Sequence, residues 1–177
     1  MSVEKDLKRK IDEYTRQIKA KPNDSESCYY NRGNAYYNLG QFELALQDFD
    51  KAVELNPNEA NYYINRGTTY HYIKKYEPAI QDYDRAVELN PNFALVYKNR
   101  GWSYCFLKKY QLAIKDFDKA IALNPNYSEA YNNRGIAYYS VRQYEKARQD
   151  FEKAYELNPN NKQAKDNIEV CRKALGK

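Results

Sequence analysis

The sequence repeats itself every 34 residues, and this period restricts the fold more than any other feature of the chain. Asn-Arg-Gly and Asn-Pro-Asn each recur four times at that spacing, with first copies at Asn31 and Asn56. A fixed period of this length indicates a repeat architecture, in which each unit buries its apolar face only against its neighbours. The sequence therefore predicts four units, at residues 26–59, 60–93, 94–127 and 128–161.

Each unit is predicted to contain two helices joined by a short turn. The first helices are expected at residues 26–39, 60–73, 94–107 and 128–141, and the second helices at 42–55, 76–89, 110–123 and 144–157. Glycine or a basic residue marks each turn, namely Gly40, Lys74, Lys108 and Arg142. Asn-Pro-Asn ends each second helix, because proline disfavours helical geometry in the residue before it.

Small and large residues alternate in fixed columns of the repeat. The small residues are Gly33, Gly67, Gly101 and Gly135, and Ala45, Ala79, Ala113 and Ala147. Glycine inside a helix costs about 0.5–1 kcal/mol relative to alanine, so four glycines in register indicate close helix packing. The large rings include Phe49, Tyr83, Phe117 and Phe151. The chain has 20 Tyr against 6 Phe, which predicts many half-buried positions, since a tyrosine hydroxyl needs water or a partner.

The two ends of the chain are predicted to be single helices. Residues 1–25 form an N-terminal amphipathic helix and partial repeat, with apolar residues from Val3 to Ile18 on one face. Residues 162–177 form a C-terminal capping helix, with Ala164 and Cys171 on its apolar face. A terminal helix with a polar outer face covers the last repeat of an array, which is the role expected here.

The repeat resembles the tetratricopeptide repeat (TPR) family over residues 26–161. The columns that carry the resemblance begin at Tyr29, Gly33, Tyr36, Ala45, Phe49, Ala52 and Pro57. The resemblance implies an all-α, right-handed α-solenoid of four helix-turn-helix units, with an extra N-terminal helix and a C-terminal capping helix. It also implies a protein–protein interaction scaffold, in which the first helices line a concave groove that holds a peptide or an extended protein segment.

Helical periodicity nominates the side chains that line this groove. They are Tyr30, Asn31, Asn34, Tyr37, Asn65, Thr68, His71, Tyr72, Lys98, Asn99, Trp102, Phe106, Asn133, Ile136 and Tyr139. Asn31 and its three copies form an asparagine column, and an amide offers both the donor and the acceptor that a peptide backbone matches. A wet helix surface that tolerates asparagine is the alternative explanation of this column.

Some family members hold the acidic C-terminal tail of a chaperone in a carboxylate clamp of two asparagines and three cations. Asn34 and Asn65 match the two asparagines. The three cation positions hold Tyr30, Leu95 and Asn99 instead. Without cations a buried carboxylate loses its charge-assisted hydrogen bonds, so a clamp is not expected.

Where the family commonly has leucine, this chain has Arg32, Arg66, Arg100 and Arg134. We expect each arginine to pair with an aspartate of the second-helix column, which comprises Asp48, Asp82, Asp116 and Asp150. A buried charge without a partner costs about 3–5 kcal/mol, which favours structural ion pairs. The alternative is that the arginines face an acidic ligand.

The sequence lacks the residue sets that catalysis and metal binding need. It has one histidine and three widely spaced cysteines, so no enzyme activity, metal or cofactor is expected. Free thiols suit a reducing compartment, which predicts a cytoplasmic location. The net charge of +5 gathers at the two ends, so neither nucleic acid nor membrane is expected as a partner.

Self-association of the array through its terminal helices is the alternative function, and RNA binding through the basic ends is a third hypothesis.

Overall fold

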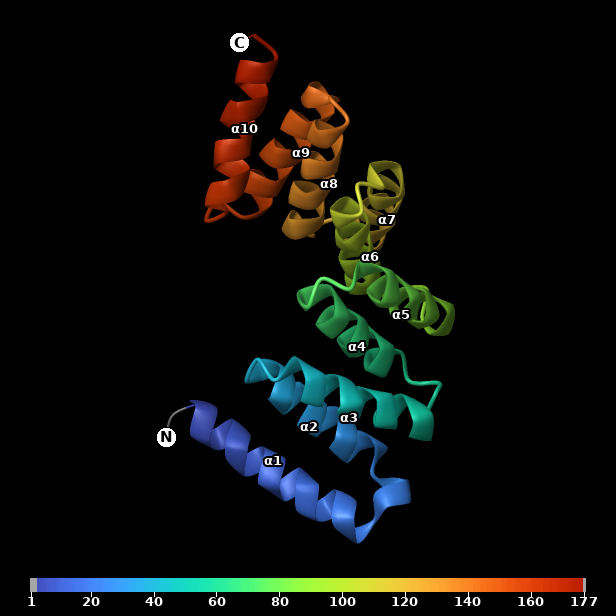
Figure 1. Ribbon diagram of the computed structural model, residues 1–177. Coiled ribbons are helices and arrows are strands. Elements are labelled where there is room, and N and C mark those ends of the chain that lie inside the picture. Colours follow the sequence, from blue (N-terminus) through green and yellow to red (C-terminus); the bar gives the residue numbers. More distant parts are fainter. Residues whose placement is uncertain (1–2, 177) are drawn as a thin grey trace. The chain divides into compact units, whose positions relative to one another are not determined.

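The computed structural model describes residues 3–176, apart from the side chain of residue 24 (Figure 1). Residues 1, 2 and 177, which belong to the predicted terminal segments, lie outside the described part. That part contains ten α-helices and no strand, which confirms the all-α class. The helices are α1 Val3–Ala20, α2 Glu26–Asn38, α3 Phe42–Leu55, α4 Ala60–Tyr72, α5 Tyr76–Leu89, α6 Ala94–Phe106, α7 Tyr110–Leu123, α8 Ser128–Ser140, α9 Tyr144–Leu157 and α10 Lys162–Ala174.

The helices divide into two compact units. The N-terminal unit contains α1–α5, and the C-terminal unit contains α6–α10. In the N-terminal unit α2 packs on α3 and α4 on α5, while α3 joins the two hairpins by packing on α4. The C-terminal unit repeats this arrangement with α6 to α9. The terminal helices extend it, since α1 packs on α2 and α10 packs on α9.

Each first helix ends in the same left-handed turn. In the first turn Gly40 has φ 73°, its N–H donates to Tyr37 O at 2.9 Å, and Gln41 N–H donates to Tyr36 O at 2.9 Å. This pair of bonds satisfies carbonyls that the helix end leaves open, and glycine is the residue that adopts the required backbone without strain. The other turns place Lys74, Lys108 and Arg142 at this position.

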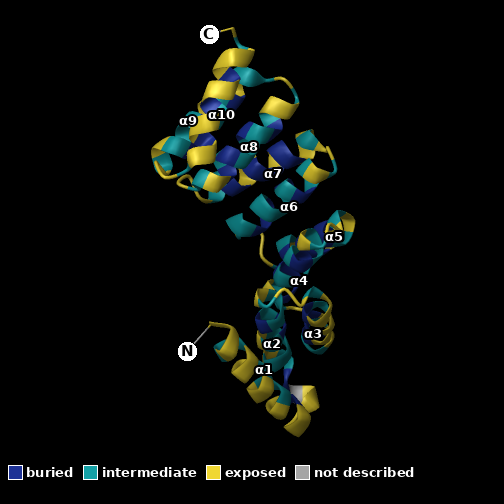
Figure 2. Ribbon diagram, turned by 60° about the vertical axis from the view of Figure 1, so that its left-hand side comes forward, coloured by how far each residue is buried: buried dark blue, intermediate teal, exposed yellow. Residues whose placement is uncertain are grey.

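The core of each hairpin is a ring packed against glycine. Phe117 is fully buried, and a Cβ added to Gly101 would lie 2.8 Å from its Cε1 atom. In the next repeat a Cβ on Gly135 would lie 2.7 Å from Phe151 Cε1. The four glycines are thus mid-helix residues at which a side chain has no room, as the packing argument requires. Figure 2 shows buried residues along the faces where helices meet and exposed residues on the outer faces of α1 and α10.

The terminal helix α10 completes the core of the last repeat. Ile168 and Cys171 of α10 form a buried cluster with Ala147 and Phe151 of α9. The opposite face of α10 is exposed. None of the helices in residues 3–176 combines the length and apolarity that crossing a bilayer requires.

Candidate functional site

The N-terminal unit has a cavity on the surface of its first helices. Asn34, Tyr37 and Asn38 of α2 line one side, and Asn65 and Thr68 of α4 line the other. Its volume is about 370 Å³, and no charged side chain lines it. The α2 and α4 helices present these residues because they lie one turn apart on one face of each helix. The cavity brings together four residues that helical periodicity nominates, Asn34, Tyr37, Asn65 and Thr68.

Hydrogen bonds fix the amide groups at this cavity. Asn65 Nδ2 donates to Asn34 Oδ1 at 2.7 Å and to Tyr30 OH at 3.0 Å. These bonds occupy both donors of the Asn65 amide, while its Oδ1 acceptor and the Asn34 Nδ2 donors form no hydrogen bond within residues 3–176. Thr68 Oγ1 donates to Ile64 O at 2.8 Å and accepts from Tyr83 OH at 3.2 Å. Thr68 therefore contributes shape to the cavity, because its hydroxyl is already engaged.

Tyr37, which lines the cavity, belongs to a group of three aromatic rings at the turn end of α2. The Tyr37 ring lies 5.6 Å from that of Phe42 and 5.5 Å from that of Tyr72, and Phe42 and Tyr72 are 5.7 Å apart. Burial, together with Tyr72, raises the pKa of Tyr37 to about 12, so its hydroxyl stays protonated at neutral pH. Tyr72 is 62% exposed and offers a flat apolar face next to the polar cavity.

Tyr30, which helical periodicity nominates as a groove residue, is half-buried. Its ring lies 4.9 Å from that of Tyr62 and 6.0 Å from that of buried Phe49, and its hydroxyl accepts the bond from Asn65. Tyr30 therefore holds Asn65, which lines the cavity, through this hydrogen bond. A tyrosine at a groove position of one helix packs on the next helix, and helical periodicity alone does not reveal that.

The C-terminal unit presents the same first-helix surface with different chemistry. The Trp102 and Phe106 rings meet edge to face at 5.3 Å, and Trp102 also packs on the core that contains Phe117. Phe106 is 48% exposed. Lys98, nominated as a groove residue, lies 3.4 Å from Glu129 and so carries a partner within its own unit.

A second, smaller cavity lies between the last repeat and α10. It has a volume of about 150 Å³, and its lining includes Ile136 and Tyr139 of α8 with Asn167 and Val170 of α10. Sequence reasoning nominated the two α8 residues and missed the two on α10. The available signal was Val170, an apolar residue off the buried face of α10 that is 44% exposed.

The remaining nominated residues are dispersed over the first-helix surfaces. Asn31 is exposed, while Asn99 and Asn133 are half-buried. The His71 ring packs edge to face on Tyr76 at 5.3 Å. Burial raises the pKa of the Cys105 thiol to about 12, which keeps it protonated and unsuited to nucleophilic chemistry. Residues 3–176 contain no group of three metal-ligating side chains.

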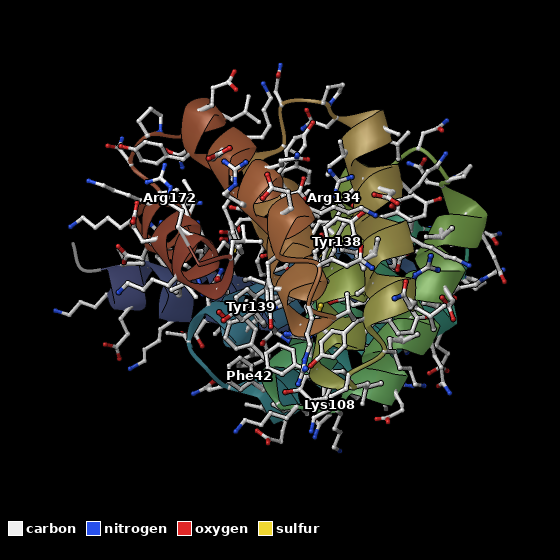
Figure 3. The ribbon with its side chains drawn as sticks, turned by 90° about the horizontal axis from the view of Figure 1, so that it is seen from above. Phe42, Lys108, Arg134, Tyr138, Tyr139 and Arg172 are labelled. Atoms are coloured by element: carbon white, nitrogen blue, oxygen red, sulfur yellow. The ribbon has the colours of Figure 1, made fainter. Side chains whose placement is uncertain are left out.

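Each arginine of the column binds a carboxylate of its own repeat. Each guanidinium forms a two-pronged contact with the aspartate sixteen positions later, as where Arg66 Nη2 lies 2.6 Å and Nε 2.9 Å from Asp82. The equivalent pairs are Arg32–Asp48, Arg100–Asp116 and Arg134–Asp150. Arg134 also faces Tyr138 at 5.8 Å, and Figure 3 shows the two side chains next to each other.

The arginines reach a second partner that the sequence argument did not identify. Arg66 Nη1 donates to Asp50 Oδ1 at 2.8 Å, and Arg134 Nη1 donates to Asp118 Oδ1 at 2.6 Å. Both acceptors belong to the second helix of the preceding repeat. Burial opposes the charge of Arg66, but hydrogen bonds to Asp82 and Asp50 outweigh it and raise its pKa above the ordinary value.

Comparison with known proteins gives a consistent family match. The sequence model described as "Tetratricopeptide repeat" matches residues 27–59, 60–93, 94–127 and 128–161. A crystal structure of MamA protein is 27% identical with a TM-score of 0.80, over 89% of this chain and 86% of that chain. The structure "First TPR of Spaghetti (RPAP3) bound to HSP90 peptide SRMEEVD" is 33% identical with a TM-score of 0.66, over 67% of this chain and 94% of that chain.

A third structure, YrrB, described as a TPR protein with an unusual peptide-binding site, shares the fold at 23% identity. Its TM-score is 0.79, over 90% of this chain and 82% of that chain. No curated protein matched this chain in a sequence comparison.

Proposed function

This chain belongs to the tetratricopeptide repeat family, a family of protein–protein interaction scaffolds, and from that premise we propose that it binds an extended peptide segment on its first-helix surface. The observation that carries the proposal is the uncharged cavity between α2 and α4. Asn34 and Asn65 present a donor and an acceptor there, which is the pair of groups that a peptide unit of a ligand requires.

The exposed rings supply the apolar part of the proposed site. Tyr72 in the N-terminal unit and Phe106 in the C-terminal unit occupy the same column of the repeat, at the ends of α4 and α6. A ring with about half of its surface exposed loses little conformational freedom on binding and covers a large apolar area. A short segment must itself be ordered, so we expect modest affinity.

We propose further that the ligand is not the acidic tail that a carboxylate clamp holds. Tyr30 stands at a clamp cation position, packs on Tyr62 and accepts from Asn65. The other two clamp cation positions hold Leu95 and Asn99, so a carboxylate would lack the charge-assisted hydrogen bonds of a clamp. The similar RPAP3 domain has an HSP90 peptide bound. Because Tyr30 stands at a clamp cation position in this chain, we propose a different class of ligand here.

A comparison of matched variants tests the first-helix placement. Peptides selected from a random library on the wild-type protein are measured against Asn38→Ala/Tyr72→Ala, which alters exposed positions beside the N-terminal cavity. We expect affinity to fall about tenfold, since exposed aromatic anchors carry much of a binding energy. The control Gln47→Ala/Gln81→Ala alters exposed residues of the second helices and should bind as the wild type does. Equal binding by all three proteins would refute the placement.

The ligand class has its own test. The peptide SRMEEVD, with a free and with an amidated C-terminus, is titrated against the protein by fluorescence anisotropy. We expect no saturable binding of either form at about 1 mM, because the clamp cations are replaced. Saturation by the free acid alone would show that a carboxylate site exists.

Self-association is the second candidate function, because both terminal helices expose apolar residues. Val3 on α1 is 78% exposed, and Val170 on α10 is 44% exposed. Sedimentation of the wild type and of Val3→Glu/Val170→Glu distinguishes this candidate, which requires that the wild type alone form oligomers.

We also propose a cytoplasmic location, which the free cysteines Cys28, Cys105 and Cys171 support.

A further inference from the structure

The turns between paired helices carry cations at a backbone position that favours glycine. In the C-terminal unit Lys108 has φ 57° and Arg142 has φ 61°, whereas the first turn of the chain has Gly40 with φ 73°. A residue with a Cβ is strained in this left-handed region, and glycine is not. Backbone strain of this kind gathers where the side chain serves a function, so the two cations require an explanation.

These cations are exposed, and the described part of the chain offers them no ion-pair partner. Lys108, Lys109 and Arg142 are all exposed, and none of them forms an ion pair with residues 3–176. The one glutamate close to these turns in sequence, Glu145, is bonded to Arg148. The end of the unit is therefore positively charged.

Apolar side chains accompany the charge. Phe106 is 48%, Leu112 43% and Tyr139 37% exposed. The turns lie at one end of the unit, because Cys105 of α6 and Val141 of the α8–α9 turn both pack on the cluster that contains Phe117. The exposed rings are also held in place, since Phe106 lies 5.3 Å from Trp102 and Tyr139 lies 5.1 Å from Tyr144.

We propose that this turn surface, which comprises Phe106, Lys108, Lys109, Leu112, Tyr139 and Arg142, binds a partner-protein segment in which carboxylates alternate with apolar side chains. Charge complementarity selects the acidic residues, and the half-exposed rings accept the apolar ones. A membrane fits less well, because the rings rest on their own unit and the exposed cations are fewer than the four to eight of typical anionic-lipid sites. The turn surface shares Phe106 with the peptide site proposed above but none of the residues that line the cavity of the N-terminal unit. Its cations therefore test this proposal apart from that site.

The double variant Lys108→Gly/Arg142→Gly tests the proposal without risk to folding. Removal of the backbone strain is expected to raise Tm by about 2 °C. The probe is a fluorescent twelve-residue peptide of alternating Glu and Leu, measured by anisotropy at 50 mM and 300 mM salt. We expect the variant to bind this probe about fivefold more weakly than the wild type, and we expect salt to weaken wild-type binding. A protein that gains stability and loses binding would show that the cations serve a ligand.

Controls separate charge and shape from backbone strain. Lys108→Arg/Arg142→Lys retains both charges and should bind as the wild type does, and a Gln-for-Glu version of the probe should bind neither protein. Phe106→Ala should weaken binding of the probe, whereas Asn38→Ala/Tyr72→Ala should leave its affinity unchanged. The proposal is wrong if the glycine variant keeps wild-type affinity, if the wild type does not bind the probe, or if it binds phosphatidylserine vesicles but not the peptide.

Discussion

At the scale of single residues, Arg66 and Arg134 each contact two repeats at once. Arg66 holds buried Asp82 of its own repeat and Asp50 of the preceding one, and its guanidinium also lies 5.5 Å from the Tyr63 ring. A planar fork with five donors is suited to this set of contacts, and a leucine has none of them. The engaged donors support the structural role that we propose for the column over the alternative of an acidic ligand.

Arg66→Leu tests that role. Asp82 is 5% exposed, so loss of its partner should reduce the free energy of unfolding by about 3 kcal/mol, as for other broken buried pairs. Urea denaturation followed by circular dichroism measures the loss. The double variant Arg66→Leu/Asp82→Leu should recover more than half of it, because no buried charge remains. A single variant as stable as the wild type, with weaker ligand binding, would favour the acidic-ligand alternative.

Gly135→Ala tests the packing of the glycine column. Alanine normally stabilises a helix interior, but here the added Cβ would lie 2.7 Å from Phe151 Cε1. We therefore expect a loss of about 1–3 kcal/mol of unfolding free energy, the usual cost of overpacking. Phe151→Leu in the same chain should make Gly135→Ala less costly than it is in the wild type, since the smaller side chain leaves room. An additive double variant would argue against the contact.

At the scale of elements, α1 packs before the first repeat in the place that the second helix of a preceding repeat would take. Arg32 Nη1 donates to Thr15 Oγ1 of α1 at 2.9 Å, where Arg66 and Arg134 reach an aspartate of the preceding second helix. Thr15 precedes Asp50 by 35 residues, and Pro22 precedes Pro57 by the same interval. The N-terminal helix therefore follows the repeat with an offset of one residue.

Thr15→Asp should complete this contact. The new carboxylate would meet Arg32 as Asp50 meets Arg66, at a partly exposed position, so we expect about 0.5 kcal/mol of added stability. Thermal unfolding at 50 mM and 500 mM salt measures the gain, which should shrink at high salt because the pair is screened. Thr15→Asn is the neutral control and should show neither gain nor salt dependence. A gain that is independent of salt would mean that the new side chain does not pair with Arg32.

The sequence was sufficient for the elements and insufficient for the orientation of their surfaces. Turn residues, Asn-Pro-Asn stops and the glycine column act locally, so the ends of the paired helices in the four repeats fall within one residue of prediction. Contacts between helices are different, because they depend on which face of each helix meets the next. Periodicity placed Tyr30 on the groove face without revealing that Tyr62 covers it. It likewise gave α10 a capping role without revealing that Asn167 and Val170 border a cavity.

At the scale of the whole molecule, stability should be the sum of local contributions. Within each unit the helices pack on their neighbours in sequence, and the described chain divides into two such units. In such arrays a local defect lowers stability near its site and decays with distance along the chain. The many small contacts of a single globular core, by contrast, make unfolding cooperative throughout.

Hydrogen exchange measured by mass spectrometry can distinguish these two behaviours in a pair of matched variants. Gly135→Ala should reduce protection in α8, α9 and α10 and leave α2 and α3 at wild-type values, because its clash with Phe151 strains only the last repeat. Gly33→Ala, whose Cβ would lie 2.8 Å from Phe49 Cε1, should do the reverse. An equal fall in protection across all helices in both variants would mean that the array unfolds as one cooperative body. A local response would also mean that a substitution in one unit leaves a ligand site in the other unit intact.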